Sequence, residues 1–444
     1  MKIYSKYKYS GEEYFGEIPE CWDLLRIGYF SELITGFPFE SKDFSLEAGI
    51  KVLRGDNVTE GRLRWGDKAR YWSRITDELK GVQLKENDIV IGMDGSKVGK
   101  NYSMIFQSDL PLLLVQRVCR IRILNENNPR WILYQIGSMI FKNYINNLKT
   151  DPMIPHITQK NVFDFKVSIP PLNEQQQGVK YLDLKSYLID NLIQKKLRKI
   201  EILKEHRTTI INLAVTKGLN PEVKMKDSWI EWIDMIPEHW MITRIDFICN
   251  LFGRLGWKSL KAEEYVDDGF IFLSTPNIKS KNIDFENVNH ITEERYNESP
   301  EIMLEIGDVL LVKDGSTLGI VNVVRNLPRP ATVNSSIGVL KIRSDNLVSE
   351  FLYYFLSSHF MQNIIERIKG GMGVPHLFQA DIKKFPVLLP PIIEQKQIVS
   401  FLDRKTSEID KQVDLENRKI DLLKEYRQSL ISEVVTGKID VRTN

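Results

Sequence analysis

The chain has 444 residues, of which 42% are hydrophobic and 27% charged, and its formal net charge is +2. This length predicts two or three domains, each large enough to bury its own core. No apolar run approaches the roughly 20 residues that cross a bilayer, and the start of the chain lacks the apolar segment of a signal peptide. We therefore expect a cytoplasmic protein without membrane contact.

Cysteine, histidine and charge distributions narrow the function classes further. Cys21, Cys119 and Cys249 are an odd number without a Cys-x-x-Cys pair, and the six histidines are dispersed. This pattern indicates neither a disulfide framework nor a zinc site, so we expect no metal and three buried thiols. Residues 1–170 contain 24 Lys and Arg against 21 Asp and Glu, whereas residues 231–390 contain 16 against 21. Any binding of DNA must therefore rely on local contacts or on a partner.

The sequence is a tandem repeat. IPECW at residues 18–22 recurs as IPEHW at 236–240, and three further motifs recur at an offset of 220. These motifs are NDIVIGMDGSKVG at 87–99 with GDVLLVKDGSTLG at 307–319, IPHITQ at 154–159 with VPHLFQ at 374–379, and IPPLNEQQQ at 169–177 with LPPIIEQKQ at 389–397. Residues 181–216 and 401–436 are identical at 15 of 36 positions. One offset held through separate motifs indicates an internal duplication.

Each half has the same predicted order of elements. Short strands come first, for example at 88–91 and 309–312, and residues 117–123 alternate as a strand does. A helix with an aromatic stripe follows, at 131–141 and again at 351–360. After a loop that contains Pro-His, a double proline ends the globular part, because no helix interior tolerates it.

A long helix is predicted after each double proline. Apolar residues recur about every 3.5 positions, which is typical of a coiled coil. The first copy places Leu182, Ile189, Leu203 and Ile210 at d and Ile193, Ile200 and Ala214 at a; the second places Leu402, Ile409, Leu423 and Leu430 at d and Val413, Ile420 and Val434 at a. Both copies interrupt this seam with polar residues, Lys196 and Glu416 at d and Arg207 and Arg427 at a. The alternative is an amphipathic helix that packs only on its own domain.

The motif order is IPExW, a DGS-x-x-G loop, Pro-His, PP-x-x-EQ, and a helix that carries RKI-x-LKE, all present twice. It resembles the specificity subunits of type I restriction–modification enzymes over nearly the whole chain. The resemblance implies an α+β fold with two tandem target recognition domains, each followed by a long helix, and an antiparallel coiled coil with pseudo-twofold symmetry. The implied boundaries are recognition domain 1 at 1–170, spacer helix 1 at 171–217, a linker at 218–230, recognition domain 2 at 231–390 and spacer helix 2 at 391–440.

The resemblance also implies partners. Each recognition domain would read one half of a split site in double-stranded DNA, and the helices would space the domains and dock two methylation subunits, through which restriction (motor) subunits join. The matched PP-x-x-EQ positions give Glu174, Gln175, Glu394 and Gln395 as docking candidates. S-adenosylmethionine, ATP and Mg would belong to these partners, so we expect this chain to bind no cofactor.

The residues themselves predict no catalysis by this chain. Neither double proline has the flanking Asn or Asp and the aromatic residue of a DNA methyltransferase, and the sequence has no Walker-A lysine. The isolated Gly-x-Gly at 371–373 is not followed by a pattern typical of a cofactor loop. For Asp94 and Asp314 we expect turn positions rather than metal ligands. For His156 and His376 we expect a structural role in a buried loop, because no acid or nucleophile accompanies them in sequence.

DNA contacts are the remaining chemistry, because arginine suits phosphates and guanine edges. The best first-domain candidates are seven cations interleaved with aromatic residues: Lys51, Arg54, Arg62, Arg64, Lys68, Arg70 and Arg74. The second domain offers Arg254, Lys258, Lys279 and Lys281. Repeated positions add Ser96, Lys97 and Lys149 in the first half and Ser316, Thr317 and Lys369 in the second. A solvated charged surface is the alternative explanation for these residues.

Three other functions are weighed. The chain could be the specificity subunit of a related system that fuses or rearranges these parts. It could also be a coiled-coil scaffold with two protein-binding domains and no DNA, or a nuclease, although the sequence shows no clustered acidic triad. A methyltransferase gene beside this one would favour a specificity subunit, of a type I or a related system, over the scaffold.

Overall fold

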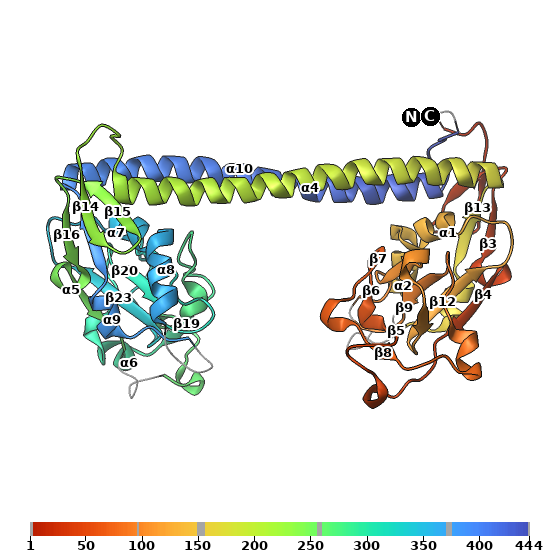
Figure 1. Cartoon of the computed structure of the whole chain (residues 1–444), viewed down its shortest axis with the longest axis horizontal. Helices are drawn as coiled ribbons and strands as arrows, with labels where there is room; N and C mark the ends of the chain where they lie inside the picture. The colour runs from red at the N-terminus through yellow and green to blue at the C-terminus, as the bar shows by residue number, and fades with distance from the viewer. Residues whose placement is uncertain (1–2, 96, 149–155, 255–259, 370–374, 443–444) are drawn as a thin grey trace. The chain divides into compact units, whose positions relative to one another are not determined.

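The computed structural model describes residues 3–95, 97–148, 156–254, 260–369 and 375–442. The chain divides into two compact units: unit 1 comprises residues 1–196 and 417–444, and unit 2 comprises residues 197–416. Each unit therefore holds one globular part together with part of both long helices, α4 (Leu172–Lys217) and α10 (Ile392–Val435) (Figure 1).

In its described residues, the globular part of unit 1 is built from short strands, short 3-10 turns and three α-helices. The strands are β1 (Tyr7–Tyr9), β2 (Glu17–Pro19), β3 (Asp23–Arg26), β4 (Ser31–Thr35), β5 (Ile50–Leu53), β6 (Val58–Thr59), β7 (Arg62–Leu63), β8 (Tyr71–Trp72), β9 (Ile89–Gly92), β10 (Tyr102–Met104), β11 (Leu112–Leu114), β12 (Val118–Ile123) and β13 (Lys166–Ile169). The helices are α1 (Pro129–Ile136), α2 (Met139–Leu148) and α3 (Gln159–Asp164). An antiparallel sheet has the order β10-β9-β12-β4, and a second sheet, β11-β5-β8, contains the parallel pair β11–β5.

Unit 2 repeats this design. Its strands are β14 (Met225–Ile230), β15 (Ile233–Pro237), β16 (Met241–Arg244), β17 (Cys249–Phe252), β18 (Phe270–Leu273), β19 (Asn289–Ile291), β20 (Val309–Val312), β21 (Val321–Val323), β22 (Ala331–Val333), β23 (Ile337–Ile342) and β24 (Pro386–Leu389). Its helices are α5 (Ile245–Ile248), α6 (Glu293–Asn297), α7 (Ser349–Leu356), α8 (His359–Ile368) and α9 (Gln379–Lys383). The sheets β17-β23-β20-β21 and β19-β18-β22 match those of unit 1, including one parallel pair, β18–β22.

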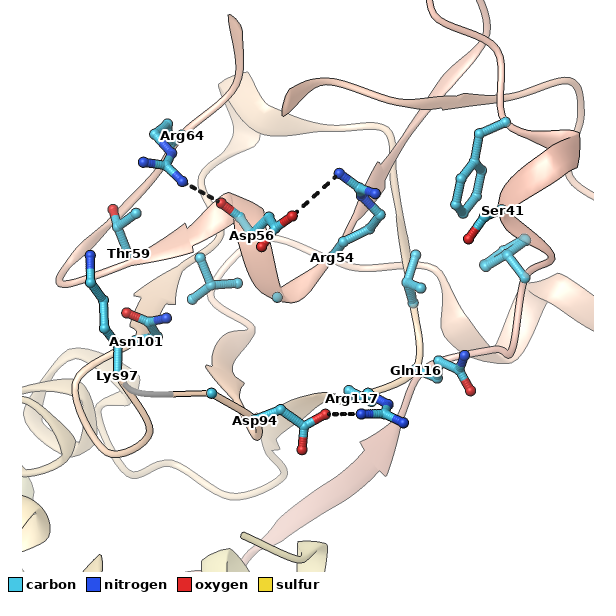
Figure 2. A pocket seen from close by; sticks show the side chains of 16 residues that line it. Ser41, Arg54, Asp56, Thr59, Arg64, Asp94, Lys97, Asn101, Gln116 and Arg117 are labelled. Atoms are coloured by element: carbon cyan, nitrogen blue, oxygen red, sulfur yellow. Dashed lines mark hydrogen bonds and ion pairs between the residues drawn. The ribbon is translucent and has the colours of Figure 1, made fainter. Parts of the chain in front are cut away.

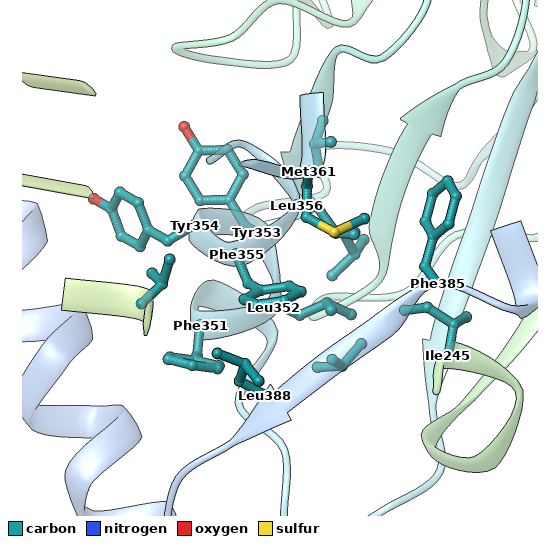
Figure 3. Close-up of a cluster of buried hydrophobic side chains, with 14 of the residues drawn as sticks. Ile245, Phe351, Leu352, Tyr353, Tyr354, Phe355, Leu356, Met361, Phe385 and Leu388 are labelled. Atoms are coloured by element: carbon teal, nitrogen blue, oxygen red, sulfur yellow. The ribbon is translucent and has the colours of Figure 1, made fainter. Parts of the chain in front are cut away.

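The predicted aromatic helix is two helices in each unit, so that prediction was wrong in extent. The Ser138 hydroxyl donates to the carbonyl of Gln135 at the end of α1 and accepts from the amide of Ile140 in α2. Ser358 does the same between α7 and α8. A serine that closes one helix and caps the next breaks the run without a proline. The aromatic side chains of α7 fill the core of unit 2 (Figure 3).

The segment 218–230, predicted to be a linker, is partly folded. Strand β14 lies within it and pairs antiparallel with β15. The globular part of unit 2 thus begins before residue 231. The equivalent hairpin of unit 1 is β1–β2, at the start of the chain.

The predicted coiled coil is confirmed in both units. α4 has 46 residues and α10 has 44, which exceeds the 36 residues of the aligned repeat because both begin directly after the double prolines. Every predicted a and d residue is buried or half-buried. In unit 2, Lys199 pairs with Glu416 at 3.0 Å and Arg207 with Asp410 at 3.2 Å, so the helices run antiparallel. In unit 1, Arg427 pairs with Asp190 at 2.5 Å.

Two smaller expectations can be compared with the structure. Cys119 and Cys249 are buried, and burial raises the pKa of both thiols to about 12. Cys21 is exposed, so the expectation of three buried thiols was wrong for this residue. Among the described residues, no helix combines the length and the apolar content that a bilayer span requires.

Candidate nucleic-acid interface

A buried asparagine fixes the loop that carries the predicted cations of unit 1. The Asn57 side chain accepts a hydrogen bond from the amide of Arg54 at 3.1 Å. Its amide group donates to the carbonyls of Arg64 at 3.1 Å and Lys68 at 3.2 Å. One side chain with no exposed surface therefore holds three basic residues of the loop in place. Sequence reasoning missed Asn57, although Asn277 repeats it at the offset of 220 with the same kind of bonds.

A concave surface of unit 1 gathers several of these cations. We call it the groove; it encloses about 520 Å³. Its lining residues are Phe39, Ser41, Phe44, Arg54, Gly55, Asp56, Val58, Thr59, Arg64, Asp94, Gly95, Lys97, Asn101, Val115, Gln116 and Arg117 (Figure 2). Three predicted residues line it: Arg54, Arg64 and Lys97.

Two arginines on one wall of the groove contact the same residue, Asp56. Arg54 Nη2 lies 3.8 Å from the Asp56 carboxylate, and Arg64 Nη2 donates to the Asp56 carbonyl at 3.3 Å (Figure 2). Arg54 also lies over the ring of Phe44 and donates to the carbonyl of Lys68. These contacts leave both guanidinium groups beside the hollow without neutralising them fully. The wall is therefore suited to an anionic ligand such as a phosphate backbone.

The opposite wall carries residues that the sequence prediction missed. Asp94 accepts from Arg117 Nη1 at 2.9 Å, and its other carboxylate oxygen contacts His156 Nδ1. Asn101 and Gln116 lie on the same wall (Figure 2). Amide and guanidinium side chains are the groups that read base edges in the major groove. The sequence predicts only a strand that starts at Arg117, because the place of this residue in the groove depends on β11, β12 and the loop after β9.

The other predicted cations of the first half do not line the groove. Lys51 lies over the ring of Trp65 at 5.2 Å, and Arg70 donates to backbone carbonyls of Asp67 and Ala69. Arg62 and Arg74 are exposed, and Lys68 is half-buried. The cluster is therefore split between the groove and an ordinary solvated surface. Ser96 and Lys149 lie outside the described residues.

The predicted cations of the second half are less accessible or already paired. Arg254 is 4% exposed and packs against Phe272, so its prediction as a DNA contact conflicts with its burial. Lys279 pairs with Asp284 at 2.9 Å and holds the pKa of that carboxyl well below its usual range. Lys281 lies 3.8 Å from Asp414.

The remaining second-half candidates differ in exposure. Lys369 is exposed and pairs with Glu366. Ser316 is exposed and Thr317 half-buried. Lys258 lies outside the described residues. These positions stay predictions as DNA contacts.

The four docking candidates have internal partners. Gln175 bonds to Asn128, Asn127 and Pro170, and Gln395 bonds equivalently to Val348, Asn346 and Pro390. Both glutamines are buried, at 1% and 0% exposure, so the prediction that they touch another subunit does not fit this structure. Glu174 and Glu394 each bind a tryptophan indole of their own unit. The PP-x-x-EQ motif fastens each long helix to its globular part.

Both units contain an aspartate–histidine contact that sequence reasoning did not foresee. Asp94 meets His156, and Asp314 meets His376. The acid that these histidines lack in sequence is supplied by the DGS loop, and His156 is exposed rather than buried. Within the described part of the chain, no group of three or more His, Cys, Asp or Glu residues is arranged to hold a metal ion. The contact joins two loops, as expected for a structural role.

Comparison with known proteins places these features in a family. The family model described as the type I restriction modification DNA specificity domain matches residues 19–202 and again residues 237–425. The type I restriction enzyme MjaVIII specificity subunit of Methanocaldococcus jannaschii is 25% identical over 430 residues, covering 96% of this chain and 94% of that protein. The EcoBI specificity subunit of Escherichia coli is 24% identical, with 95% and 87% covered.

A solved chain shares the fold. It is described by the words "Structural basis underlying complex assembly and conformational transition of the type I R-M system". It superposes with a TM-score of 0.71 at 16% identity, covering 95% of this chain and 99% of that chain.

Proposed function

The chain belongs to the type I restriction modification DNA specificity family, and we propose that each of its two globular parts recognises one half of a bipartite DNA site. The two matches to the family model correspond to the two repeated globular parts with their helices. The observation that carries the proposal is the groove of unit 1. It combines arginines suited to phosphates with amide side chains suited to base edges.

We propose that the chain itself is not catalytic and binds no cofactor. In this proposal two methylation subunits bind the coiled coil and supply the S-adenosylmethionine site, and restriction subunits supply ATP and Mg chemistry. Docking must then use side chains other than Gln175 and Gln395, because these are buried. Exposed apolar residues of the long helices, such as Leu188, Leu192 and Leu422, are available for such contacts. A cytoplasmic location is part of this proposal, because the DNA target lies there.

The test is reconstitution. The chain is purified alone and together with a type I methylation subunit from the same host, and each preparation is incubated with genomic DNA and S-adenosylmethionine. Single-molecule sequencing then maps the methylated bases. We expect no methylation by either protein alone and methylation of one bipartite motif by the assembled complex.

Two results would overturn the proposal. Methylation by the isolated chain would show that it is catalytic. A complex that forms but methylates without sequence preference would favour the alternative, a coiled-coil scaffold with two protein-binding domains.

A further inference from the structure

Arg117 has an unusual backbone conformation. Its φ of 67° lies in the left-handed region, which arginine rarely adopts. The residue sits in the turn between β11 and β12, where its carbonyl accepts a hydrogen bond from the amide of Met93 at 3.0 Å. Ser336 occupies the same turn of unit 2 and accepts from Lys313 at 2.7 Å without a positive φ. The turn alone therefore does not require the strained conformation, and strain of this kind often accompanies a functional position.

The Arg117 side chain is held at one end and open at the other. Its Nη1 donates to Asp94 at 2.9 Å, and Asp94 is itself held by His156. The guanidinium makes no other hydrogen bond within the described residues, and the side chain is 71% exposed. The Asp94 side chain is only 21% exposed, so this carboxylate is a fixed support for the exposed guanidinium of Arg117. The free edge of the guanidinium borders the groove (Figure 2).

A guanidinium fixed by a carboxylate has a preferred ligand among the groups of DNA. Its remaining N–H groups form a planar fork that matches the O6 and N7 acceptors of guanine. We propose that Arg117 reads a guanine in one half-site, with Asp94 as the positioning residue that sets the angle of the fork. The inference rests on the proposed function and adds one specificity-determining residue to it.

The second unit provides an internal comparison. It keeps the Asp314–His376 contact, but Ser336 stands where unit 1 has Arg117. Ser274 and Asp284 likewise replace Arg54 and Arg64 of the other wall. The contact between the two loops is thus repeated in unit 2, whereas the arginine side chains of the groove are not. We therefore expect no guanine contact from Ser336 in the second half-site.

The competing explanation is that Arg117 only grips a phosphate. The two roles separate in a lysine variant, because lysine keeps the charge for a phosphate but lacks the planar guanidinium fork, so its single ammonium group cannot hold Asp94 and both guanine acceptors in the same arrangement. Arg117→Lys should then behave like the wild type if the ligand is a phosphate. If the ligand is guanine, it should lose discrimination while its salt dependence stays the same.

The experiment uses the complex with the methylation subunit and maps methylated motifs for the wild type, Arg117→Ala, Arg117→Lys and the matched control Ser336→Ala. We expect Arg117→Ala and Arg117→Lys to relax one G·C position of one half-site, with discrimination falling by about 10- to 100-fold. The other half-site should stay unchanged, and Ser336→Ala should leave both intact. Asp94→Asn should weaken discrimination at the same base pair.

Several outcomes would overturn the inference. They are a wild-type motif in which neither half contains G·C, an unchanged motif with Arg117→Ala, or full discrimination by Arg117→Lys. If the wild-type complex methylates no bipartite motif, the proposed function fails and this inference fails with it. If the wild-type complex methylates a bipartite motif and the Arg117 variants methylate the same motif, the inference alone fails. Thermal unfolding of each assembled complex shows whether a variant that methylates nothing has lost its fold, and Arg117→Lys, which keeps a positive charge beside Asp94, then decides.

Discussion

Glu174, in the first turn of α4, accepts a hydrogen bond from the indole Nε1 of Trp22 at 3.0 Å. Tyr4 donates to the same carboxylate at 3.1 Å, and Arg442 lies 3.4 Å away. Glu394 repeats the bond to Trp240 at 3.1 Å, but there the other partner is His239. One carboxylate in each repeat thus joins the IPExW motif to the helix that follows the globular part. The two motifs lie about 150 residues apart in sequence and meet only in the folded chain.

We expect Glu174→Ala to destabilise unit 1. The variant leaves the buried Trp22 N–H and Tyr4 O–H without their acceptor, which costs about 1–3 kcal/mol for each buried group. Hydrogen exchange of the full chain should show faster exchange in β2 and at the start of α4. Glu394→Ala is the control, with a smaller effect in unit 2, because the Glu394 side chain is 22% exposed and that of Glu174 only 10%. Equal effects in both units would contradict this account.

The long helices could be predicted because their signals are local. The apolar spacing and the double prolines lie within the segment that folds, and the repeat doubled the signal. The groove could be predicted only in part. Arg54 and Arg64 stood out by composition, whereas Asn57 and Arg117 act through residues brought together by β-sheet pairing. Gln175 and Gln395 do not fit as docking residues for a related reason: a motif that recurs can mark a contact within the unit as well as a contact with another subunit.

A buried charge in unit 2 predicts a stabilising variant. Lys313 is 6% exposed, and burial lowers its pKa from 10.5; its equivalent in unit 1 is Met93, at 4%. Between the lowered folded pKa and 10.5 the unfolded chain binds more protons, so wild-type stability should rise with pH across this window. We expect Lys313→Met to raise the free energy of unfolding by about 1–4 kcal/mol, the range for replacing buried charges by apolar groups of similar volume.

The Lys313→Met gain should be full below the folded pKa and shrink as pH approaches 10.5. Urea unfolding at several pH values measures it. Met93→Lys, the reverse change in unit 1, should be destabilising. A gain that does not depend on pH would mean that the lysine charge is not its cause.

A helical glycine should resist replacement by alanine. Alanine normally stabilises a helix interior by about 1 kcal/mol relative to glycine. At Gly178 of α4, however, a Cβ would lie 2.5 Å from the ring of Trp131, which is buried. We expect Gly178→Ala to cost about 1–3 kcal/mol through overpacking. Unit 2 accommodates Ile398 at the equivalent place, where Phe351 replaces the larger tryptophan.

The matched test for Gly178 is the double variant Gly178→Ala with Trp131→Phe, measured by urea unfolding against both single variants. The smaller ring makes room for the methyl group, so the double variant should lose less stability than the two single losses added together. Additive losses, or a more stable Gly178→Ala, would show that the two side chains do not compete for space.

The salt dependence of DNA binding should separate groove cations from surface cations. Each lost phosphate contact lowers the slope of log K against log salt by about 0.9. We expect the double variant Arg54→Ala and Arg64→Ala to reduce the slope for the assembled complex by up to about twice this value, because it removes two such contacts. Arg62→Ala with Arg74→Ala removes the same charge from exposed positions outside the groove and should change the slope less. Equal slopes for the two double variants would indicate that DNA does not enter the groove.

The last prediction concerns the helices as a spacer. The boundary between the units falls inside both helices, after Lys196 and after Glu416. Seven residues inserted after Arg198 and seven after Arg418, equivalent places in the repeats, preserve the heptad seam of both helices. They add about 10 Å at 1.5 Å per residue, which corresponds to about three base pairs. Methylation mapping should then show both half-sites unchanged and the gap longer by about three base pairs. A single insertion after Arg198 is the control and should disrupt assembly, because only one helix of the antiparallel pair is lengthened. If the double insertion leaves the gap as it was, or alters either half-site, the helices do not set the spacing.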